Sequence, residues 1–146
     1  MTDSELMQLS EKIGRALKAR GATVTTAESC TGGWIAKAIT DIAGSSAWFE
    51  RGFVTYSNEA KSQMIGVSEA TLRDNGAVSE PVVVEMAIGA LRAARADYAI
   101  SVSGVASVSG QGVTRRECFA GDREAVRRQA TAYALNLLWQ QFLQNT

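Results

Sequence analysis

Three side chains able to act as nucleophiles stand together in the stretch TTAESCTGG, residues 25–33: Ser29, Cys30 and Thr31. A β-branched run precedes them and a glycine pair follows, so we expect a turn between a strand and a helix. The first turn of a helix offers unpaired N–H groups and the positive end of the helix dipole, which stabilise a developing oxyanion. This pattern indicates attack on a carbonyl group, although Ser29 or Thr31 capping the helix would explain it equally well.

A nucleophilic serine needs a base, and the chain contains no histidine. A Ser-His-Asp triad and a Cys-His dyad are therefore excluded within the chain. A lysine serves as a base when burial lowers its pKa towards neutrality. The stretch TYSNEAK places Tyr56 at the end of an expected strand and Lys61 about one helical turn later,. Both can face the same end of the sheet, but the spacing also fits a half-buried tyrosine and a solvated lysine.

Cys30 is the alternative nucleophile, since a helix dipole would help to stabilise its thiolate. Successive residues of a strand point to opposite faces, so Ser29 and Cys30 are not expected to face the same site. A cysteine in this position is more often a small buried apolar residue. We therefore expect Ser29 to attack, with an amidase that uses Cys30 as a competing hypothesis.

The elements that would position these residues alternate between strand and helix. Thr2 and Glu5 have the spacing of a capping box, Gly21 ends the first helix, and Asp122 caps the last one,. Helices are expected over 2–20, 34–44, 59–66, within 68–79, over 79–94 and after 122, and strands over 22–28, 48–58, 97–106 and 114–121. This alternation predicts an α/β fold, and 146 residues suffice for one domain with a full core,.

The composition excludes several classes of function. The 15 basic and 15 acidic side chains cancel, which argues against a general nucleic-acid binder,. No apolar run approaches the ~20 residues of a membrane helix, and the N-terminal segment lacks an apolar signal-peptide core. We expect a cytoplasmic protein without a membrane partner. Its two cysteines, Cys30 and Cys118, lie far apart, so neither a disulfide framework nor a metal site is expected,.

Several segments together resemble the CinA C-terminal domain family. They are TTAESCTGG, GFVTYSNEAK, GAVSEPVVVEMA, SVSGVA and ECFAGDREAVRRQATAYAL, and they extend over almost the whole chain. The resemblance implies one domain over residues 1–146, folded as a three-layer α/β/α sandwich with a mixed sheet. It also implies hydrolysis of nicotinamide mononucleotide (NMN) to nicotinate mononucleotide and ammonia, in pyridine nucleotide salvage, with no metal or other cofactor. A homo-oligomer is expected from general frequency alone.

The family's motifs transfer roles to individual residues. The serine of A-E-S-C-T-G-G is Ser29, the implied nucleophile, and the tyrosine and lysine of Y-S-N-x-x-K are Tyr56 and Lys61, the implied proton-handling pair. Lys61, with Tyr56 relaying the proton or orienting the amine, would deprotonate Ser29 for attack on the carboxamide. Ammonia would then leave, and water would hydrolyse the acyl-enzyme.

The substrate contacts are expected from three places in the chain. The backbone N–H groups of Thr31, Gly32 and Gly33 would hold the oxyanion, and the S-G-[IV]-A motif lies at the end of a strand near the site. Arg123 follows the cap of the last helix, where dipole and guanidinium both attract the 5′-phosphate. Arg127 and Arg128 are expected on a solvated face. The candidate substrate-binding residues are Glu28, Thr31, Gly32, Gly33, Ser103, Gly104, Ala106 and Arg123.

The sequence departs from the family pattern after SGVA. Family members continue with a glycine-rich G-P-x-G-G loop and a K-P-V-G-T-V strand, and about twenty such residues have no counterpart here near 106–107,. Either the protein lacks this segment, or the 146-residue sequence omits one that the protein carries. A true deletion would have to re-pair the sheet around 99–105 and 114–119. It could leave an inactive nucleotide-binding domain, which is the alternative function.

Overall fold

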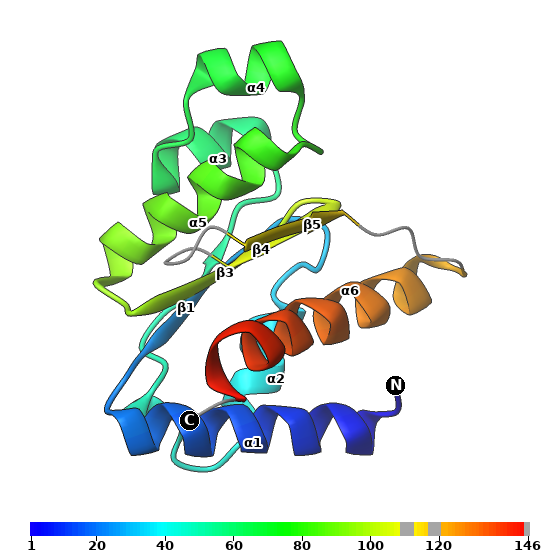
Figure 1. The fold of residues 1–146 in the computed structure, drawn as a ribbon. Coiled ribbons are helices and arrows are strands. Elements are labelled where there is room, and N and C mark those ends of the chain that lie inside the picture. The colour runs from blue at the N-terminus through cyan, green and yellow to red at the C-terminus, as the bar shows by residue number, and fades with distance from the viewer. Residues whose placement is uncertain (109–112, 117–120, 145–146) are drawn as a thin grey trace.

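A five-stranded mixed sheet forms the centre of the computed structural model, which describes residues 1–108, 113–116 and 121–144. The strand order is β2-β1-β3-β4-β5 (Figure 1). The strands are β1 (Val24–Glu28), β2 (Phe53–Val54), β3 (Tyr98–Val102), β4 (Val105–Val108) and β5 (Val113–Arg116). The first three run parallel, whereas β4 is antiparallel to both of its neighbours, β3 and β5.

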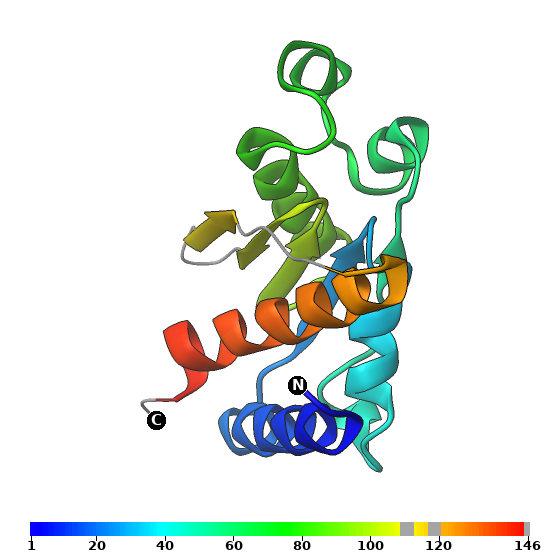
Figure 2. The same cartoon turned by 90° about the vertical axis from the view of Figure 1, so that its right-hand side faces the viewer.

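One face of the sheet is covered by α2 (Trp34–Thr40) and α6 (Arg123–Leu138). A π-helical turn, Trp139–Leu143, extends α6. The long helix α1 (Asp3–Arg20) packs across these two helices rather than on the sheet (Figures 1 and 2). Its apolar stripe, spaced at helical intervals, joins the larger core cluster together with apolar residues of α2, α6 and β3,.

The other face is covered by α5 (Glu80–Ala94), which lies on β1, β3 and β4. The short helices α3 (Asn58–Ile65) and α4 (Glu69–Asn75) pack on α5 and close a second core cluster (Figure 1). A single 3-10 turn, Ser45–Ala47, precedes β2. The predicted three-layer α/β/α sandwich with a mixed sheet is therefore confirmed.

The end signals of α1 and α6 behave as predicted, whereas the helix expected over 34–44 ends earlier, at Thr40, and Gly44 instead begins the 3-10 turn. Thr2 and Glu5 form a capping box at the start of α1, and Gly21 ends this helix in the left-handed region with φ 62°,. Asp122 caps α6 by accepting a hydrogen bond from the N–H of Ala125 at 2.9 Å,.

Two expected strands differ from those observed. The segment 48–58 contributes only Phe53–Val54 to the sheet. Before Phe53, the segment contacts β1 through one backbone hydrogen bond and through a bond from Thr25 Oγ1 to the carbonyl of Arg51, which do not make a ladder of strand pairing. The segment 97–106 forms two antiparallel strands instead of one. Gly104, with φ 69°, turns the chain between them, and a Cβ there would lie 2.6 Å from Val78 Cγ1,.

The short strand β4 completes the sheet in the 146-residue chain. Residues 105–108 lie between β3 and β5 and pair with both, so β3 does not pair directly with Val113–Arg116. The ends of the expected loop over 108–113, Val108 and Val113, belong to β4 and β5, and its residues 109–112 lie outside the described residues. Of the expected strand 114–121, residues 114–116 belong to β5, residues 117–120 lie outside the described residues, and Gly121 lies in a bend. Cys118 therefore lies outside the described residues as well.

The parallel pairing of β1 with β2 brings two chain segments to one edge of the sheet. Glu28 lies opposite Val54, and the N–H of Thr55 donates to the carbonyl of Glu28 at 2.8 Å. The residues that follow each strand therefore meet at the same place, which is where ligands bind in sheets of this type. Ser29 follows β1, and the segment after β2 leads directly into α3.

The close packing of α5 against α3 makes a test of how firmly α3 is held. A Cβ on Gly89 of α5 would lie 1.8 Å from the carbonyl oxygen of Ile65 at the end of α3. Since this atom belongs to the backbone, Gly89→Ala must displace α3, and we expect a loss of about 1–3 kcal/mol in the free energy of unfolding. Urea denaturation measures it, and Arg92→Ala, at an exposed position of the same helix, should change stability by less than about 0.5 kcal/mol. Equal stability of both variants would contradict the packing described.

Candidate active site

The side chains of Ser29 and Lys61 meet at this edge of the sheet. Lys61 Nζ lies 3.2 Å from Ser29 Oγ, although 32 positions separate the two residues in sequence. Lys61 belongs to the first turn of α3, which Ser57 begins by accepting a hydrogen bond from the N–H of Ala60 at 3.0 Å. The predicted nucleophile and the predicted base are therefore in hydrogen-bond contact.

Lys61 is buried to an unusual degree for a lysine, with 1% of its surface exposed,. Burial lowers the pKa of its amine below the ordinary 10.5, because removal from water disfavours the charged form; the nearby Cys30 opposes this in part and raises the pKa,. No ion pair within the described part of the chain includes Lys61. The site thus makes the neutral amine more accessible than it is for a lysine in water.

The three partners of Lys61 Nζ can all accept a hydrogen bond, and two of them are enough for the neutral form,. Besides Ser29 Oγ, the amine lies 3.0 Å from the carbonyl oxygen of Thr55 and 3.2 Å from that of Tyr56. A neutral amine has two N–H groups and one lone pair. When the two carbonyls accept both N–H groups, the lone pair is left for the hydroxyl of Ser29. This arrangement can take a proton from Ser29 and return it.

Tyr56 takes part through its backbone. Its carbonyl accepts from Lys61 Nζ and lies 3.5 Å from Ser29 Oγ, whereas its side chain is 64% exposed. Among the described residues, no hydrogen bond joins the phenol to Ser29 or Lys61. Of the two expected roles, the contacts support orienting the amine, and the support comes from the peptide carbonyl.

A cavity of about 620 Å³ opens over this pair. Besides Ser29, Tyr56 and Lys61, it is lined by three further predicted site residues, Ser103, Gly104 and Arg123. The Ser103 hydroxyl donates to the carbonyl of Ala77 at 2.9 Å and so holds the loop before α5 against the cavity. The structure therefore brings six of the predicted site residues together.

Cys30 lines the same cavity as Ser29, contrary to the expectation from strand alternation. The reason is that β1 ends at Glu28, so residues 29–33 form turns in which successive side chains need not oppose each other,. Cys30 Sγ accepts a hydrogen bond from the N–H of Gly104 at 3.4 Å. Both candidate nucleophiles therefore line the cavity. Of the two, only Ser29 has a hydrogen bond to Lys61.

Glu28 lies beneath the turn and does not line the cavity. Its side chain is fully buried, and its carboxylate accepts hydrogen bonds from Thr31 Oγ1 and from the N–H groups of Ile35 and Ala36. Ala106, another predicted contact, is buried in β4 and does not line the cavity either. Neither residue is placed where it would touch a substrate in this cavity.

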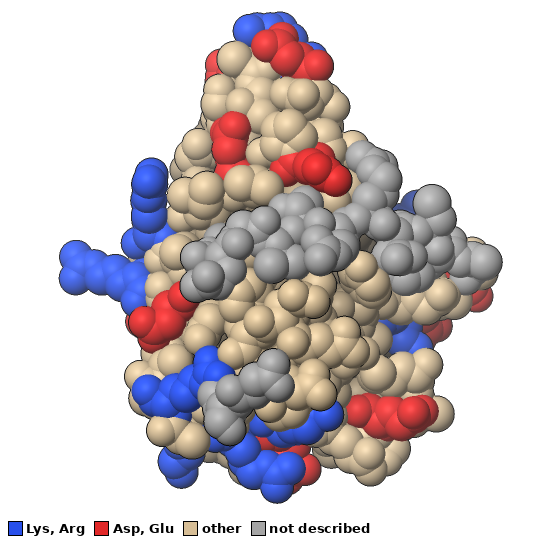
Figure 3. Space-filling model, in the orientation of Figure 1, with Lys and Arg blue, Asp and Glu red and all other residues tan. Residues whose placement is uncertain are grey.

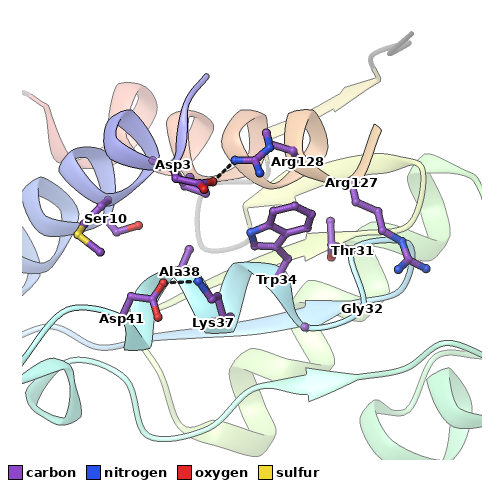
Figure 4. Close-up of a pocket in the computed structure, with 13 residues that line it drawn as sticks. Asp3, Ser10, Thr31, Gly32, Trp34, Lys37, Ala38, Asp41, Arg127 and Arg128 are labelled. Carbon is purple, nitrogen blue, oxygen red and sulfur yellow. Dashed lines mark hydrogen bonds and ion pairs between the residues drawn. The ribbon is translucent and has the colours of Figure 1, made fainter. Parts of the chain in front are cut away.

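The glycine pair borders a second cavity of about 560 Å³ between α1, α2 and α6 (Figure 4). Thr31, Gly32 and Gly33 line it, together with Trp34. Two ion pairs, Asp3 with Arg128 and Lys37 with Asp41, lie at its edges (Figure 4). The Arg128 guanidinium also lies over the ring of Trp34, 5.2 Å from its centre. These three predicted residues belong to the turn after Ser29 and border this second cavity, not the cavity over Ser29.

Arg127 lies between the two cavities, whereas the sequence predicted a solvated face for it. It is half-buried, points towards Gly32 and lines both cavities (Figure 4). The available signal was its spacing of four residues from Arg123, because residues four apart share one face of a helix. The expectation of a solvated face is incomplete for Arg128 also, since that side chain pairs with Asp3.

The surface adds little to the assignment of a site. In the face shown in Figure 3, the described Lys and Arg side chains and the Asp and Glu side chains form separate small groups. The described residues contain no group of three or more acidic or cysteine side chains placed to hold a metal ion. None of the helices in the described ranges is long and apolar enough to cross a membrane.

Known proteins similar to this chain agree with the sequence and the fold. Nicotinamide-nucleotide amidohydrolase PncC of Escherichia coli (strain K12) is 74% identical over 165 aligned positions that cover 100% of both chains. The aligned length exceeds the 146 residues of this chain by 19, so at least 19 positions of the alignment have no residue here. PncC of Enterobacter agglomerans is 54% identical, covering 99% of this chain and 100% of its own.

Solved structures and a family model complete the comparison. The crystal structure of competence damage-inducible protein A (ComA) from Klebsiella pneumoniae subsp. pneumoniae MGH 78578 superposes with a TM-score of 0.93 and 40% identity, covering 97% of this chain and 99% of that one. The model of the CinA C-terminal domain matches residues 6–113. The chain therefore belongs to the CinA C-terminal domain family.

Proposed function

We propose that this chain is a nicotinamide-nucleotide amidohydrolase that converts NMN and water to nicotinate mononucleotide and ammonia. One observation carries the proposal, namely the hydrogen bond between Ser29 and the buried amine of Lys61 in an open cavity. The names of the full-length relatives, nicotinamide-nucleotide amidohydrolase PncC, support the choice of substrate.

In the acylation step, the lone pair of Lys61 Nζ takes the proton of Ser29 Oγ. The oxygen attacks the carboxamide carbon of NMN, and a tetrahedral oxyanion forms. The C–N bond then breaks, and the Lys61 ammonium gives its proton to the leaving nitrogen, so ammonia departs. An acyl ester on Ser29 is left, and Lys61 is neutral again.

In the second step, water takes the place of ammonia. Lys61 accepts a proton from water while the water oxygen attacks the ester carbon. The bond to Ser29 Oγ breaks, and Lys61 returns the proton to that oxygen. The carbonyls of Thr55 and Tyr56 keep the amine oriented in both steps, since they hold its two other N–H groups.

Backbone donors of the turn after Ser29 are proposed to hold the oxyanion. The N–H of Gly32 is already used, because it donates to the carbonyl of Ser29 at 3.1 Å. The N–H groups of Thr31 and Gly33 have no hydrogen bond to any described residue. Of the three predicted donors, these two have unused N–H groups,. Both residues line the second cavity rather than the one over Ser29, so an oxyanion there would have to reach them from the Ser29 side of the turn.

Arg123 and Arg127 are proposed to bind the 5′-phosphate. Both line the cavity over Ser29, and they lie four residues apart on one face of α6. Within the described part of the chain neither forms an ion pair. Two unpaired guanidinium groups next to a reacting serine suit a substrate that carries a phosphate dianion.

The alternative is an inactive nucleotide-binding domain that lacks the family's glycine-rich segment. We favour activity and propose that residues 1–146 form one working domain, because β4 fills the sheet without that segment and the Ser29–Lys61 pair is in place. Cytoplasmic location, a homo-oligomeric state and the absence of cofactor, membrane and nucleic-acid partners stay predictions.

An ammonia-release assay with NMN on protein of measured intact mass tests this function. We expect activity from a chain of 15.6 kDa, and a loss of at least about a thousandfold in Ser29→Ala, because no other hydroxyl among the described residues bonds to Lys61,. An inactive 15.6 kDa protein that still binds NMN would overturn the proposal in favour of the binding domain. About twenty further residues would add about 2 kDa, at roughly 110 Da per residue. Activity found only in such a heavier protein would show that the missing segment is required.

The pH dependence of kcat/KM tests the role of Lys61. Catalysis needs the neutral amine, so activity should rise with pH and level off above a pKa lower than 10.5. Since Cys30 raises the pKa of Lys61, Cys30→Ser should move this rise to lower pH and keep at least about a third of kcat,. An inactive Cys30→Ser would instead identify the thiol as the nucleophile.

A comparison of substrates with and without phosphate tests Arg127. Arg127→Met should raise KM for NMN by about 10- to 100-fold, the effect of one charge-assisted hydrogen bond, and change kcat little. Arg127→Met should not change the hydrolysis of nicotinamide riboside, because this substrate lacks the phosphate. Arg128→Met is the matched control on the next position of α6, and its KM for NMN should stay within about twofold of the wild type. An equal effect of Arg127→Met on both substrates would refute the assignment.

A further inference from the structure

We propose that Glu28 and Thr31 are positioning residues for the nucleophile, which lock the turn that presents Ser29 to Lys61. The inference rests on the proposed amidohydrolase function and adds two residues to its machinery. It also replaces the expected substrate contact of the Glu28 carboxylate and of the Thr31 hydroxyl by an internal role.

The Glu28 carboxylate forms three hydrogen bonds inside the protein. Its Oε1 accepts from Thr31 Oγ1 at 2.7 Å and from the N–H of Ile35 at 2.8 Å. Its Oε2 accepts from the N–H of Ala36 at 3.0 Å. Glu28 is 0% exposed and Thr31 is 3% exposed, so water does not compete for these bonds.

These bonds replace a missing helix cap. Gly33 stands at the N-cap position of α2 and has no side chain with which to bind the first N–H groups of the helix. The carboxylate of Glu28, at the end of β1, fills that position from seven and eight residues earlier in the chain. A carboxylate at a helix start is stabilised both by the N–H groups and by the helix dipole.

The contacts close a loop around Ser29. The backbone of the loop's first residues is fixed by the sheet, since the N–H of Thr55 donates to the carbonyl of Glu28 and the N–H of Ser29 donates to that of Val102. The far side of the loop is fixed by Glu28 and its three donors. Ser29 lies between two anchored points, and Thr31 Oγ1 is the one side-chain link inside the turn itself.

Because the carboxylate of Glu28 is buried, the turn is sensitive to the loss of any one of its three donors. No described ion pair includes Glu28, so these three donors are what compensates the carboxylate. Loss of one donor to a buried charge costs more than loss of a neutral bond, and the turn must shift to find a replacement. A shift of Ser29 Oγ away from Lys61 Nζ, now 3.2 Å apart, would slow acylation without altering the phosphate contacts,.

Two substitutions at one position test the inference. Thr31→Val keeps the shape of the side chain and removes the hydroxyl, whereas Thr31→Ser keeps the hydroxyl and removes the methyl group. We expect Thr31→Val to lower kcat for NMN by about tenfold or more with KM within about twofold, and Thr31→Ser to have a kcat at least about fivefold above that of Thr31→Val. Thr40→Val, the same change at an exposed position of α2 away from Ser29, should keep the kcat of the wild type.

Glu28→Gln provides a second, independent variant. Its amide can still accept from Thr31, but its NH₂ group would face the N–H of Ala36, so we expect the same loss in kcat with KM little changed. Thermal unfolding of all variants separates stability from catalysis, because a merely structural role predicts that kcat of the folded enzyme is unaffected.

The outcomes separate this inference from the proposed function. A wild-type chain that releases no ammonia from NMN refutes the function itself. An active wild type with unchanged kcat in Thr31→Val or in Glu28→Gln overturns the positioning role. An increase in KM without a loss in kcat overturns it too, and assigns these side chains to substrate binding. Loss of kcat in Thr31→Val, together with its partial rescue in Thr31→Ser, supports the role.

Discussion

The site depends on one interaction, the burial of the Lys61 amine between two backbone carbonyls and the hydroxyl of Ser29. In water a lysine is charged at neutral pH and cannot accept a proton. Here burial disfavours the charge and lowers the pKa of the amine,. The carbonyls of Thr55 and Tyr56 can accept both N–H groups of the neutral form. In the proposed mechanism, a chain without histidine thereby obtains a base that faces the hydroxyl of Ser29. Burying the lysine lowers the free energy of unfolding, and the same burial is what allows the amine to accept a proton.

The fold supplies this interaction by joining neighbouring parallel strands at one edge of the sheet. Ser29 follows β1, whereas the two carbonyls follow β2 and lead into α3, which carries Lys61. On one side, α5 holds α3 in place through close backbone packing at Gly89. On the other side, α2 and its bonds to Glu28 fix the turn that contains Ser29. Each layer of the sandwich therefore contributes one boundary of the site.

Local signals in the sequence predicted most of the fold, and tertiary geometry decided the rest. The capping box of α1, Gly21 and Asp122 act within a few residues of their own position, so their roles could be read directly. The reversal at Gly104 could not, because an unbroken β-like run passes through it. The motif identified Ser29, Tyr56 and Lys61 as residues. It could not indicate that Tyr56 contacts Lys61 through its carbonyl, that Cys30 lines the same cavity, or that the carboxylate of Glu28 binds the N–H groups of α2. These contacts depend on distances between elements.

The state of the Lys61 amine is the point on which the whole account rests, and it can be measured directly. The chain has only four lysines, so NMR spectra of protein labelled with ¹³C at lysine Cε resolve few signals, and Lys61→Arg assigns the one of interest. A pH titration then gives the pKa of Lys61 in the folded protein. The account predicts a value below 10.5. A pKa at or above 10.5 would show a charged lysine that cannot deprotonate Ser29, and would contradict the proposed mechanism.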